Sequence, residues 1–218
     1  MKRAAERSPK LAIGDSENFA SWDELLKDLK RRGLKGVVYA VSDNHTGLTR
    51  AIQKNLQGAV WQRCQVHLMR NILGHTPSKL RAEVAKEVKL ILWAPDIGEA
   101  RRRLKAFQER FGKLTPKALD CLEEGFEDAM AVMSLPEKYR KRLRSTNMLE
   151  RLNEEVRRRE RVIRIFPCPE SALRLIGAML AEVHEEWLEK TYLDMDAFHE
   201  EVGARGAPQD NGPVVLRV

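Results

Sequence analysis

An uninterrupted apolar segment, Val37-Val-Tyr-Ala-Val41, most constrains the fold of this chain. A strand that is apolar at every position, and not only at alternate ones, is typical of a strand buried on both faces in a helix-covered sheet. It is followed by a predicted helix (about 47–56), a further strand (58–63) and a further helix from about Cys64. This alternation predicts an α/β fold with a mainly parallel sheet.

Most of the remaining sequence has helical periodicity, so the predicted fold class is a helix-rich α/β protein. The sequence Ser21-Trp-Asp-Glu24 has the form of a capping box and predicts a helix from about Trp22 to Gly33, preceded by a short strand at 11–13. Further helices are predicted at the following ranges: 79–93, 96–111, 116–133, 147–162 and 170–190. Residues 1–10 and 203–218 are expected to be disordered.

Composition excludes several classes of protein. At 218 residues the chain can bury one core with a subdomain. It has no apolar run near the roughly 20 residues of a membrane span, and no apolar segment follows its basic N-terminus, so we expect neither a membrane partner nor secretion. Three widely spaced cysteines, Cys64, Cys121 and Cys168, indicate reduced thiols in a cytoplasmic protein.

The positive charge is concentrated in one segment. Between Lys138 and Arg164 eleven Lys and Arg residues face four acids, an excess of seven that equals the net charge of the whole chain. Such a field favours a polyanion as partner, although an arginine run can also be a solvated helix face. The arginines that we expect to bind DNA are Arg144, Arg151, Arg157, Arg158, Arg159, Arg161 and Arg164.

Two carboxylates stand out as candidate metal ligands. Asp43 directly follows the Val37–Val41 strand, at the edge of an open α/β sheet where ligands bind, although Asp is also a common turn residue. Glu150 shares one face of a predicted helix with Asn153 and Arg157, at positions i, i+3 and i+7, opposite an apolar face that includes Leu149. The alternative for Glu150 is a capping residue that bonds to a backbone N–H.

Cys64 and His67 have one half of a zinc-binding spacing. A structural zinc needs four ligands, and no second Cys/His pair occurs in the sequence. We therefore favour a core cysteine packed near Trp61 and a histidine held by local hydrogen bonds.

Three segments, SDNHTGLTRAI, WQRCQVHLMRN and STNMLERLNEEVRRRERVIRIFP, occur in this order. Together they resemble the DDE transposases of the IS256 (Mutator-like) family, over roughly residues 11–190. The resemblance implies an RNase H-like core, in two parts at 11–77 and 136–195, interrupted by an all-helical insertion at 78–135. Asn44 and Cys168 depart from the usual family residues, which are Gly or Ala and Asn respectively.

The resemblance also implies a chemistry and a set of site residues. Asp43 matches the second catalytic Asp and Glu150 the catalytic Glu, and both would bind Mg²⁺ or Mn²⁺. Cys64, His67 and Asn153 match signature residues, and no structural zinc is expected. The partners would be DNA (transposon ends and target) on the bacterial nucleoid, and a second copy or an intact transposase.

The first catalytic Asp of the family would lie upstream of the segment equivalent to 11–17. We therefore expect a C-terminal fragment with an incomplete core that is inactive alone; the alternative is a non-catalytic DNA-binding or transposase-binding regulator. In the RNase H-like strand order the Val37–Val41 strand would become an exposed edge, which predicts aggregation.

Overall fold

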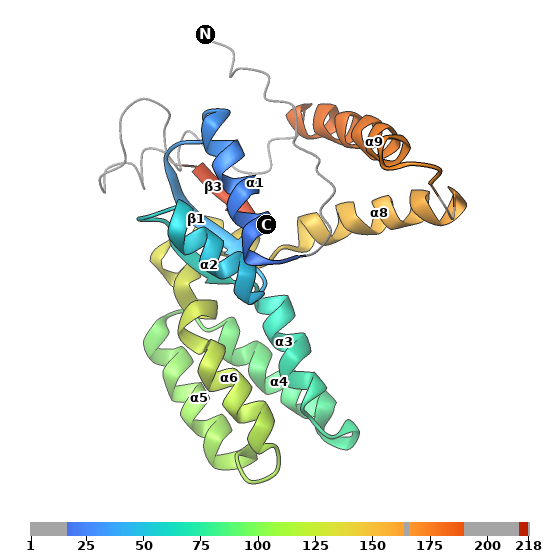
Figure 1. The fold of residues 1–218 in the computed structure, drawn as a ribbon. Helices are drawn as coiled ribbons and strands as arrows, with labels where there is room; N and C mark the ends of the chain where they lie inside the picture. The colour runs from blue at the N-terminus through green and yellow to red at the C-terminus, as the bar shows by residue number, and fades with distance from the viewer. Residues whose placement is uncertain (1–16, 164–165, 190–213, 218) are drawn as a thin grey trace.

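The computed structural model describes residues 17–163, 166–189 and 214–217. Within them a three-stranded parallel sheet is covered by helices on both faces, and a helical bundle projects from one end of the sheet (Figure 1). The predicted helix-rich α/β class is confirmed. The expected disordered start, the expected strand at 11–13 and Arg164 lie outside the described residues.

The apolar segment forms the central strand of this sheet. Strand β1 (Val37–Ser42) lies between β2 (Val60–Arg63) and β3 (Val214–Arg217), and both neighbours are parallel to it. Tyr39 pairs with Val60 of β2 and with Val215 of β3. The side chains of β1 are buried from Tyr39 onward, so burial on both faces is confirmed.

Strand β3 corrects two expectations. Residues 214–217, placed in the disordered tail, form a strand, and the neighbouring β1 is therefore not the exposed edge that we expected. The physical reason is local: Val214-Val-Leu is a β-branched and apolar run, and the backbone N–H and C=O groups of β1 need partners. The part of that tail at 203–213 lies outside the described residues.

Helices α1 (Phe19–Arg31) and α2 (Thr46–Asn55) cover one face of the sheet, where Leu26 and Ile52 pack with Ala40. The expected capping box at Ser21 is wrong by three residues: Asn18 caps α1 and accepts a hydrogen bond from the Ser21 N–H at 3.0 Å. The predicted stop is correct, because Gly33 takes a φ of 95° and the Leu34 N–H donates to the Leu29 carbonyl at 2.8 Å.

The opposite face is covered by the 3₁₀ helix η2 (Ala131–Ser134) and the short helix α7 (Glu137–Leu143). Tyr39 and Val41 of β1 pack there against four side chains: Val132, Leu135, Tyr139 and Leu143. Helix α7 was not predicted.

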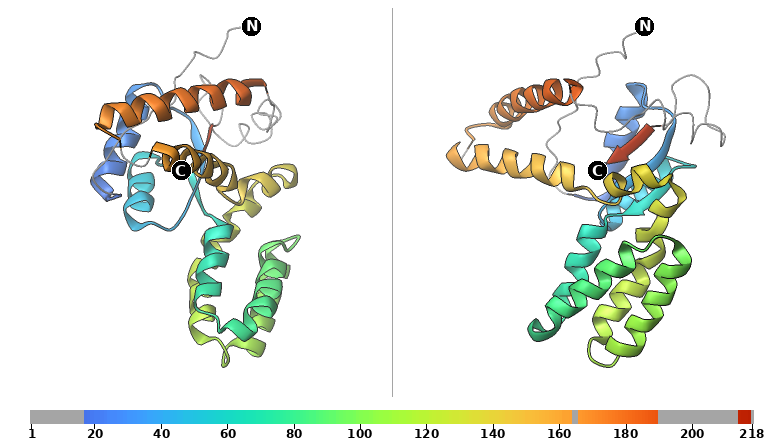
Figure 2. Two further views of the ribbon diagram at one scale, coloured as in Figure 1. Left: turned by 90° about the vertical axis from the view of Figure 1, so that its right-hand side faces the viewer. Right: turned by 180° about the vertical axis from the view of Figure 1, so that it is seen from behind.

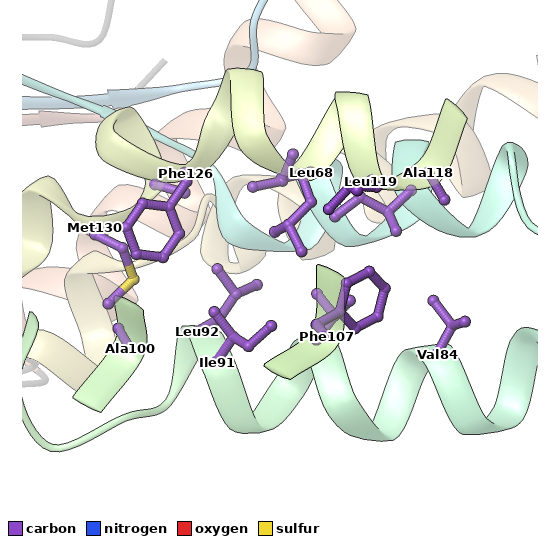
Figure 3. Close-up of a cluster of buried hydrophobic side chains, with 14 of the residues drawn as sticks. Leu68, Val84, Ile91, Leu92, Ala100, Phe107, Ala118, Leu119, Phe126 and Met130 are labelled. Carbon is purple, nitrogen blue, oxygen red and sulfur yellow. The ribbon is translucent and has the colours of Figure 1, made fainter. Parts of the chain in front are cut away.

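The bundle that projects from the sheet contains α3 (Gln65–Gly74), η1 (Ser78–Leu80), α4 (Arg81–Leu92), α5 (Ile97–Phe111) and α6 (Pro116–Met130) (Figure 2). It has a hydrophobic core of its own, and Leu68, Ile91 and Phe126 belong to this one cluster of buried side chains (Figure 3). The helices predicted between 79 and 133 are present, and α3 packs with them although it precedes the expected insertion boundary at 78.

Gln62 joins this bundle to the sheet. Its buried side chain donates to the Ala129 carbonyl at 2.7 Å and accepts from the Val132 N–H at 2.6 Å and the Tyr39 hydroxyl at 3.0 Å. Gln65 also donates to the Ala129 carbonyl, at 2.8 Å. The end of α6 is thereby fixed to the end of β2.

Helix α8 (Asn147–Ile163) extends away from the sheet and the bundle, and α9 (Pro169–Glu189) follows it (Figures 1 and 2). None of the α8 side chains is buried among the described residues. In the part of the chain that the structure describes, no helix is both long and apolar enough to span a membrane.

Candidate active site

A pocket of about 370 Å³ lies at the carboxyl end of β1, where α3 and the beginning of α8 meet. It brings together Asp43 and Glu150, the two carboxylates that the sequence singled out. The complete lining is Glu17, Trp22, Asp43, His45, Leu48, His67, Arg70, Thr146, Leu149, Glu150, Asn153, Glu154 and Arg157.

Asp43 closes a turn, which was one of the two roles considered for it, and it also lines the pocket. Its Oδ1 atom accepts a hydrogen bond from the His45 N–H at 3.1 Å, which closes the turn after β1. The same side chain lines the pocket, and its Oδ2 atom has no hydrogen bond within the described residues. The turn therefore fixes the carboxylate and leaves one oxygen for a ligand.

Glu150 faces two basic side chains of α3. Its Oε1 atom lies 3.4 Å from Nε2 of His67, and its Oε2 atom lies 3.8 Å from Nη2 of Arg70. Oε1 is buried and makes no hydrogen bond of good geometry to any described residue. The capping role considered for Glu150 is wrong, since its contacts are with α3 and not with a backbone N–H. A buried carboxylate oxygen that lies near a basic side chain but accepts no hydrogen bond remains available to a cation.

The C-x₂-H segment holds the beginning of α8 in place. The Sγ atom of the buried Cys64 lies 3.4 Å from both the backbone nitrogen and the hydroxyl oxygen of Thr146, each of which donates to it. The Gln65 N–H donates to the Arg144 carbonyl at 3.0 Å. Our expectation that local hydrogen bonds hold His67 is wrong. Its Nε2 atom faces Glu150, and its buried Nδ1 atom has no hydrogen-bond partner among the described residues. The hydrogen-bond contacts of Cys64 are with Thr146, and its packing near Trp61 stays a prediction.

The predicted polar face of α8 is confirmed, because Glu150, Asn153 and Arg157 all line the pocket. Leu149, which was expected on the opposite face, lines it as well. The pocket therefore combines a carboxylate, an amide and a guanidinium on successive turns of one helix with an apolar side chain of the same helix.

Five further polar residues of the pocket were missed in the sequence: Glu17, His45, Arg70, Thr146 and Glu154. His45 caps α2 through Nδ1, which accepts from the Leu48 N–H at 3.4 Å, and it follows Asp43 in the same turn. Arg70 follows Cys64 and His67 at intervals of three, so this spacing could have placed it on the same face of α3. Glu17 and Trp22 reach the pocket from the beginning of α1 and its preceding residues, which local sequence could not indicate.

Comparison with known proteins shows the family of the chain. The model of the Mutator family of transposases matches residues 10–190. The chain belongs to this family. It is 43% identical over 185 residues to the transposase for insertion sequence element ISRM5 of Rhizobium meliloti. It is 42% identical over 192 residues to the transposase for IS256 in transposon Tn4001 of Staphylococcus aureus. Each alignment covers 84% of this chain, but the chain spans about half the length of these curated relatives, 46% and 48%.

The arginines of this Mutator-family chain have different surroundings. Arg157 lines the pocket, Arg151 and Arg161 are exposed on α8, and Arg158 and Arg159 pair with Glu155 at 2.7 and 3.0 Å. The hydrogen bonds from Arg158 and then Arg159 lower the pKa of Glu155 to about 2. Arg144 is half-buried: it donates to the Leu92 and Arg140 carbonyls, and its guanidinium lies 4.2 Å from the centre of the Trp93 ring. Its predicted contact with DNA stays a prediction.

The carboxylate oxygens of the two candidate residues are ligands of the kind that a hard divalent cation prefers, but only two carboxylates are involved. Asp43 and Glu150 supply carboxylate oxygens, the ligands that Mg²⁺ and Mn²⁺ prefer. Over residues 17–163, 166–189 and 214–217, no three His, Cys, Asp or Glu side chains converge closely enough to hold a metal ion. The expectation that the chain has no structural zinc stays a prediction.

Proposed function

We propose that this pocket is the site at which a Mutator-family transposase cleaves and joins DNA strands, with Asp43 and Glu150 as its metal-binding carboxylates. The supporting observation is that these two side chains, one after β1 and one on α8, line the same pocket. A bound Mg²⁺ or Mn²⁺ would activate a water or a DNA 3′-hydroxyl and stabilise the leaving oxygen of a phosphodiester. We also infer that the three-stranded sheet is part of an RNase H-like core, with the α3–α6 bundle as its insertion.

The other residues of the pocket have supporting roles in this proposal. His67 and Arg70 orient the Glu150 carboxylate, since each lies within 4 Å of one of its oxygens. Arg157 presents a guanidinium that can bind a DNA phosphate, and Asn153 presents an amide that can donate or accept a hydrogen bond beside it. Cys64 acts indirectly, because it fixes Thr146 at the beginning of the helix that carries Glu150.

The ligand count suggests weak metal binding by this chain alone. Two carboxylates on separate elements can hold one ion loosely, but a pair of ions about 3.5–4 Å apart requires a further bridging or terminal ligand. We therefore propose that the chain alone cleaves DNA at no more than the background rate, and that additional ligands complete the site.

Titration calorimetry with Mn²⁺ on the full chain tests the two carboxylates. We expect Asp43→Asn and Glu150→Gln each to weaken binding by at least about tenfold, because each removes one of two charged ligands. Glu109→Gln changes an exposed carboxylate on α5 in the same way and should leave the affinity unchanged. Unaltered Mn²⁺ affinity in both site variants would refute the proposed metal site.

A non-catalytic, DNA-binding role is the second candidate, and the exposed arginines of α8 favour it. Duplex DNA should bind with an affinity that falls as salt rises. Replacing Arg157, Arg158 and Arg159 with Ala should weaken this binding evenly across sequences and flatten its salt dependence. Mn²⁺ titration separates the two candidates, because both predict no nicking by the chain alone. Mn²⁺ binding that is lost in Asp43→Asn indicates the metal site, and salt-dependent DNA binding without Mn²⁺ binding indicates the binding role.

We further propose that α8 contacts a second copy of the chain or an intact transposase. Val162 and Ile163 near its end are 81% and 40% exposed, and such apolar side chains gain by burial in an interface. Analytical ultracentrifugation of the wild type and of Val162→Ser with Ile163→Ser tests this: equal sedimentation at all concentrations contradicts it.

A further inference from the structure

Arg63, the last residue of β2, is a buried cation that has no hydrogen-bond or ion-pair partner among the described residues. Only 4% of its surface is exposed. Its Nε atom is completely enclosed. A charge in this position is costly unless an anion neutralises it, so Arg63 requires an explanation.

Helix α6 is shaped to receive this guanidinium. Gly125 lies in the interior of α6, where glycine costs about 1 kcal/mol relative to alanine. A Cβ atom at this position would lie 2.7 Å from Nη1 of Arg63 and 3.1 Å from its Cζ. The glycine therefore lets the guanidinium lie directly against the backbone of the helix.

Arg63 opens into a second pocket of about 630 Å³, which is separate from the pocket of Asp43 and Glu150. Arg70 and Lys117 contribute two more positive charges to its wall. Two exposed acids, Asp120 and Glu124, also line it, but neither pairs with Arg63. Three cations and two acids line this pocket, and a third acid outside its lining, Asp128, acts on Arg63 electrostatically without forming an ion pair.

The two pockets are neighbours. Arg70 lines both of them, with Nη2 3.8 Å from Oε2 of Glu150. Asn44, which lines the second pocket, is the residue next to Asp43. A polyanion that passes the carboxylates can therefore place another of its charged groups in the second pocket.

We propose that Arg63, Arg70 and Lys117 form an anion-binding pocket that takes a backbone phosphate of DNA beside the candidate active site. The assignment of the anion to DNA rests on the proposed function. A guanidinium offers two parallel N–H groups to a phosphate, and a water-poor surrounding strengthens the pairing. This site adds a contact from the bundle to those expected from α8.

Cys121 provides a reporter, because its thiol lines the same pocket. Cys64 is fully buried, so in the full-length Cys168→Ser variant Cys121 is the remaining accessible thiol. Its alkylation by iodoacetamide, an uncharged reagent, is measured at low salt with increasing short duplex DNA or inorganic phosphate. We expect DNA to slow the reaction at least threefold in a saturable way. Protection by inorganic phosphate but not by DNA would overturn the assignment to DNA.

Two substitutions in this background test the cations, and a third serves as control. Arg63→Met keeps the volume and removes the buried charge, and Lys117→Ala changes the exposed rim and leaves the core intact. Each should weaken DNA binding roughly three- to tenfold and lower the slope of log affinity against log salt by about one. Lys113→Ala, exposed and outside the pocket, should change neither quantity. Unchanged DNA affinity and unchanged Cys121 protection in both Arg63→Met and Lys117→Ala would overturn the proposal.

The result is separable from the test of Asp43 and Glu150. Arg63→Met should retain Mn²⁺ affinity, and Asp43→Asn should retain DNA protection of Cys121. Loss of Mn²⁺ binding only in the carboxylate variants, with no protection of Cys121 in any variant, refutes the anion pocket and leaves the metal site. The reverse pattern refutes the metal site and supports the anion pocket.

Discussion

The sulfur of Cys64 lies 3.4 Å from the hydroxyl oxygen of Thr146, 82 positions further along the chain. This contact joins the end of the sheet to the residue immediately before α8, four positions from Glu150. The Cys of the C-x₂-H segment thus supports a helix, and its His faces the carboxylate of that helix.

Removing this support should destabilise the protein and weaken the proposed metal site together. Cys64→Ala should lower the free energy of unfolding by about 1–3 kcal/mol, because it removes a buried sulfur and both Thr146 contacts. Thr146→Val removes only the hydroxyl donor and should cost about 0.5–1.5 kcal/mol. Urea unfolding and Mn²⁺ titration measure the two effects, with Cys121→Ala as a half-exposed control. Full stability in Cys64→Ala would contradict the supporting role.

Gln62→Leu should cost about 2–4 kcal/mol, because the Val132 N–H, the Tyr39 hydroxyl and the Ala129 carbonyl lose a buried partner. The same change at the exposed Gln53 should cost less than about 0.5 kcal/mol. Thermal unfolding of both variants measures the difference. Equal melting temperatures would show that Gln62 does not join the bundle to the sheet.

Two glycine-to-alanine changes in helices should have opposite signs. In Gly125→Ala the new Cβ would lie 2.7 Å from Nη1 of Arg63 and 2.8 Å from Cδ1 of Leu68, so overpacking of about 1–3 kcal/mol should exceed the helix-propensity gain. Gly177→Ala in α9 meets no atom within 4 Å and should stabilise by up to about 1 kcal/mol. Chemical denaturation of the two variants checks the signs; stabilisation by Gly125→Ala would contradict the close packing of Arg63.

Stability should depend on pH through Asp23, which links α1 to α2. The hydrogen bond from Lys27, followed by that from Asn55, holds the pKa of this carboxyl well below its usual range. Its stabilising contribution is complete above the unfolded-state pKa of about 4 and is lost as the pH falls toward the folded-state pKa. The melting-temperature difference between wild type and Asp23→Asn should therefore be largest near neutral pH and shrink below about pH 4.

Glu24→Gln is the matched control, because Glu24 pairs with Arg31 in an exposed position. It should show a much smaller dependence on pH. A constant difference between wild type and Asp23→Asn from pH 7 to pH 3 would contradict the role of the ionised Asp23.

Local sequence was sufficient for much of the fold. The apolar run predicted β1, and the spacing of Glu150, Asn153 and Arg157 predicted the polar face of α8. Each of these depends on residues within a few turns of one another. Helix α7 was not predicted, although Tyr139 and Leu143 have the i, i+4 spacing of a buried face.

The rest of the site depends on docking between distant segments. Nothing near Cys64 indicates that its sulfur faces Thr146, and nothing near Glu17 indicates that it lines the pocket. The same holds for Arg63, whose burial without a hydrogen-bond partner depends on the position of α6, a helix distant in the sequence. The resemblance to a family singled out Asp43 and Glu150, but it gave no indication of the second pocket.

The pairing of β3 with β1 also has a kinetic consequence. Val214 pairs with Val37 across about 177 intervening positions, whereas Val60 pairs with Tyr39 across about 21. Because the entropy of loop closure rises with the logarithm of loop length, the longer closure costs about 2 kcal/mol more. The β1–β2 pair should therefore form early and β3 should dock late, so the central strand is open on one side while the chain folds. Chaperones and self-association would compete with β3 for the same row of backbone groups during this interval.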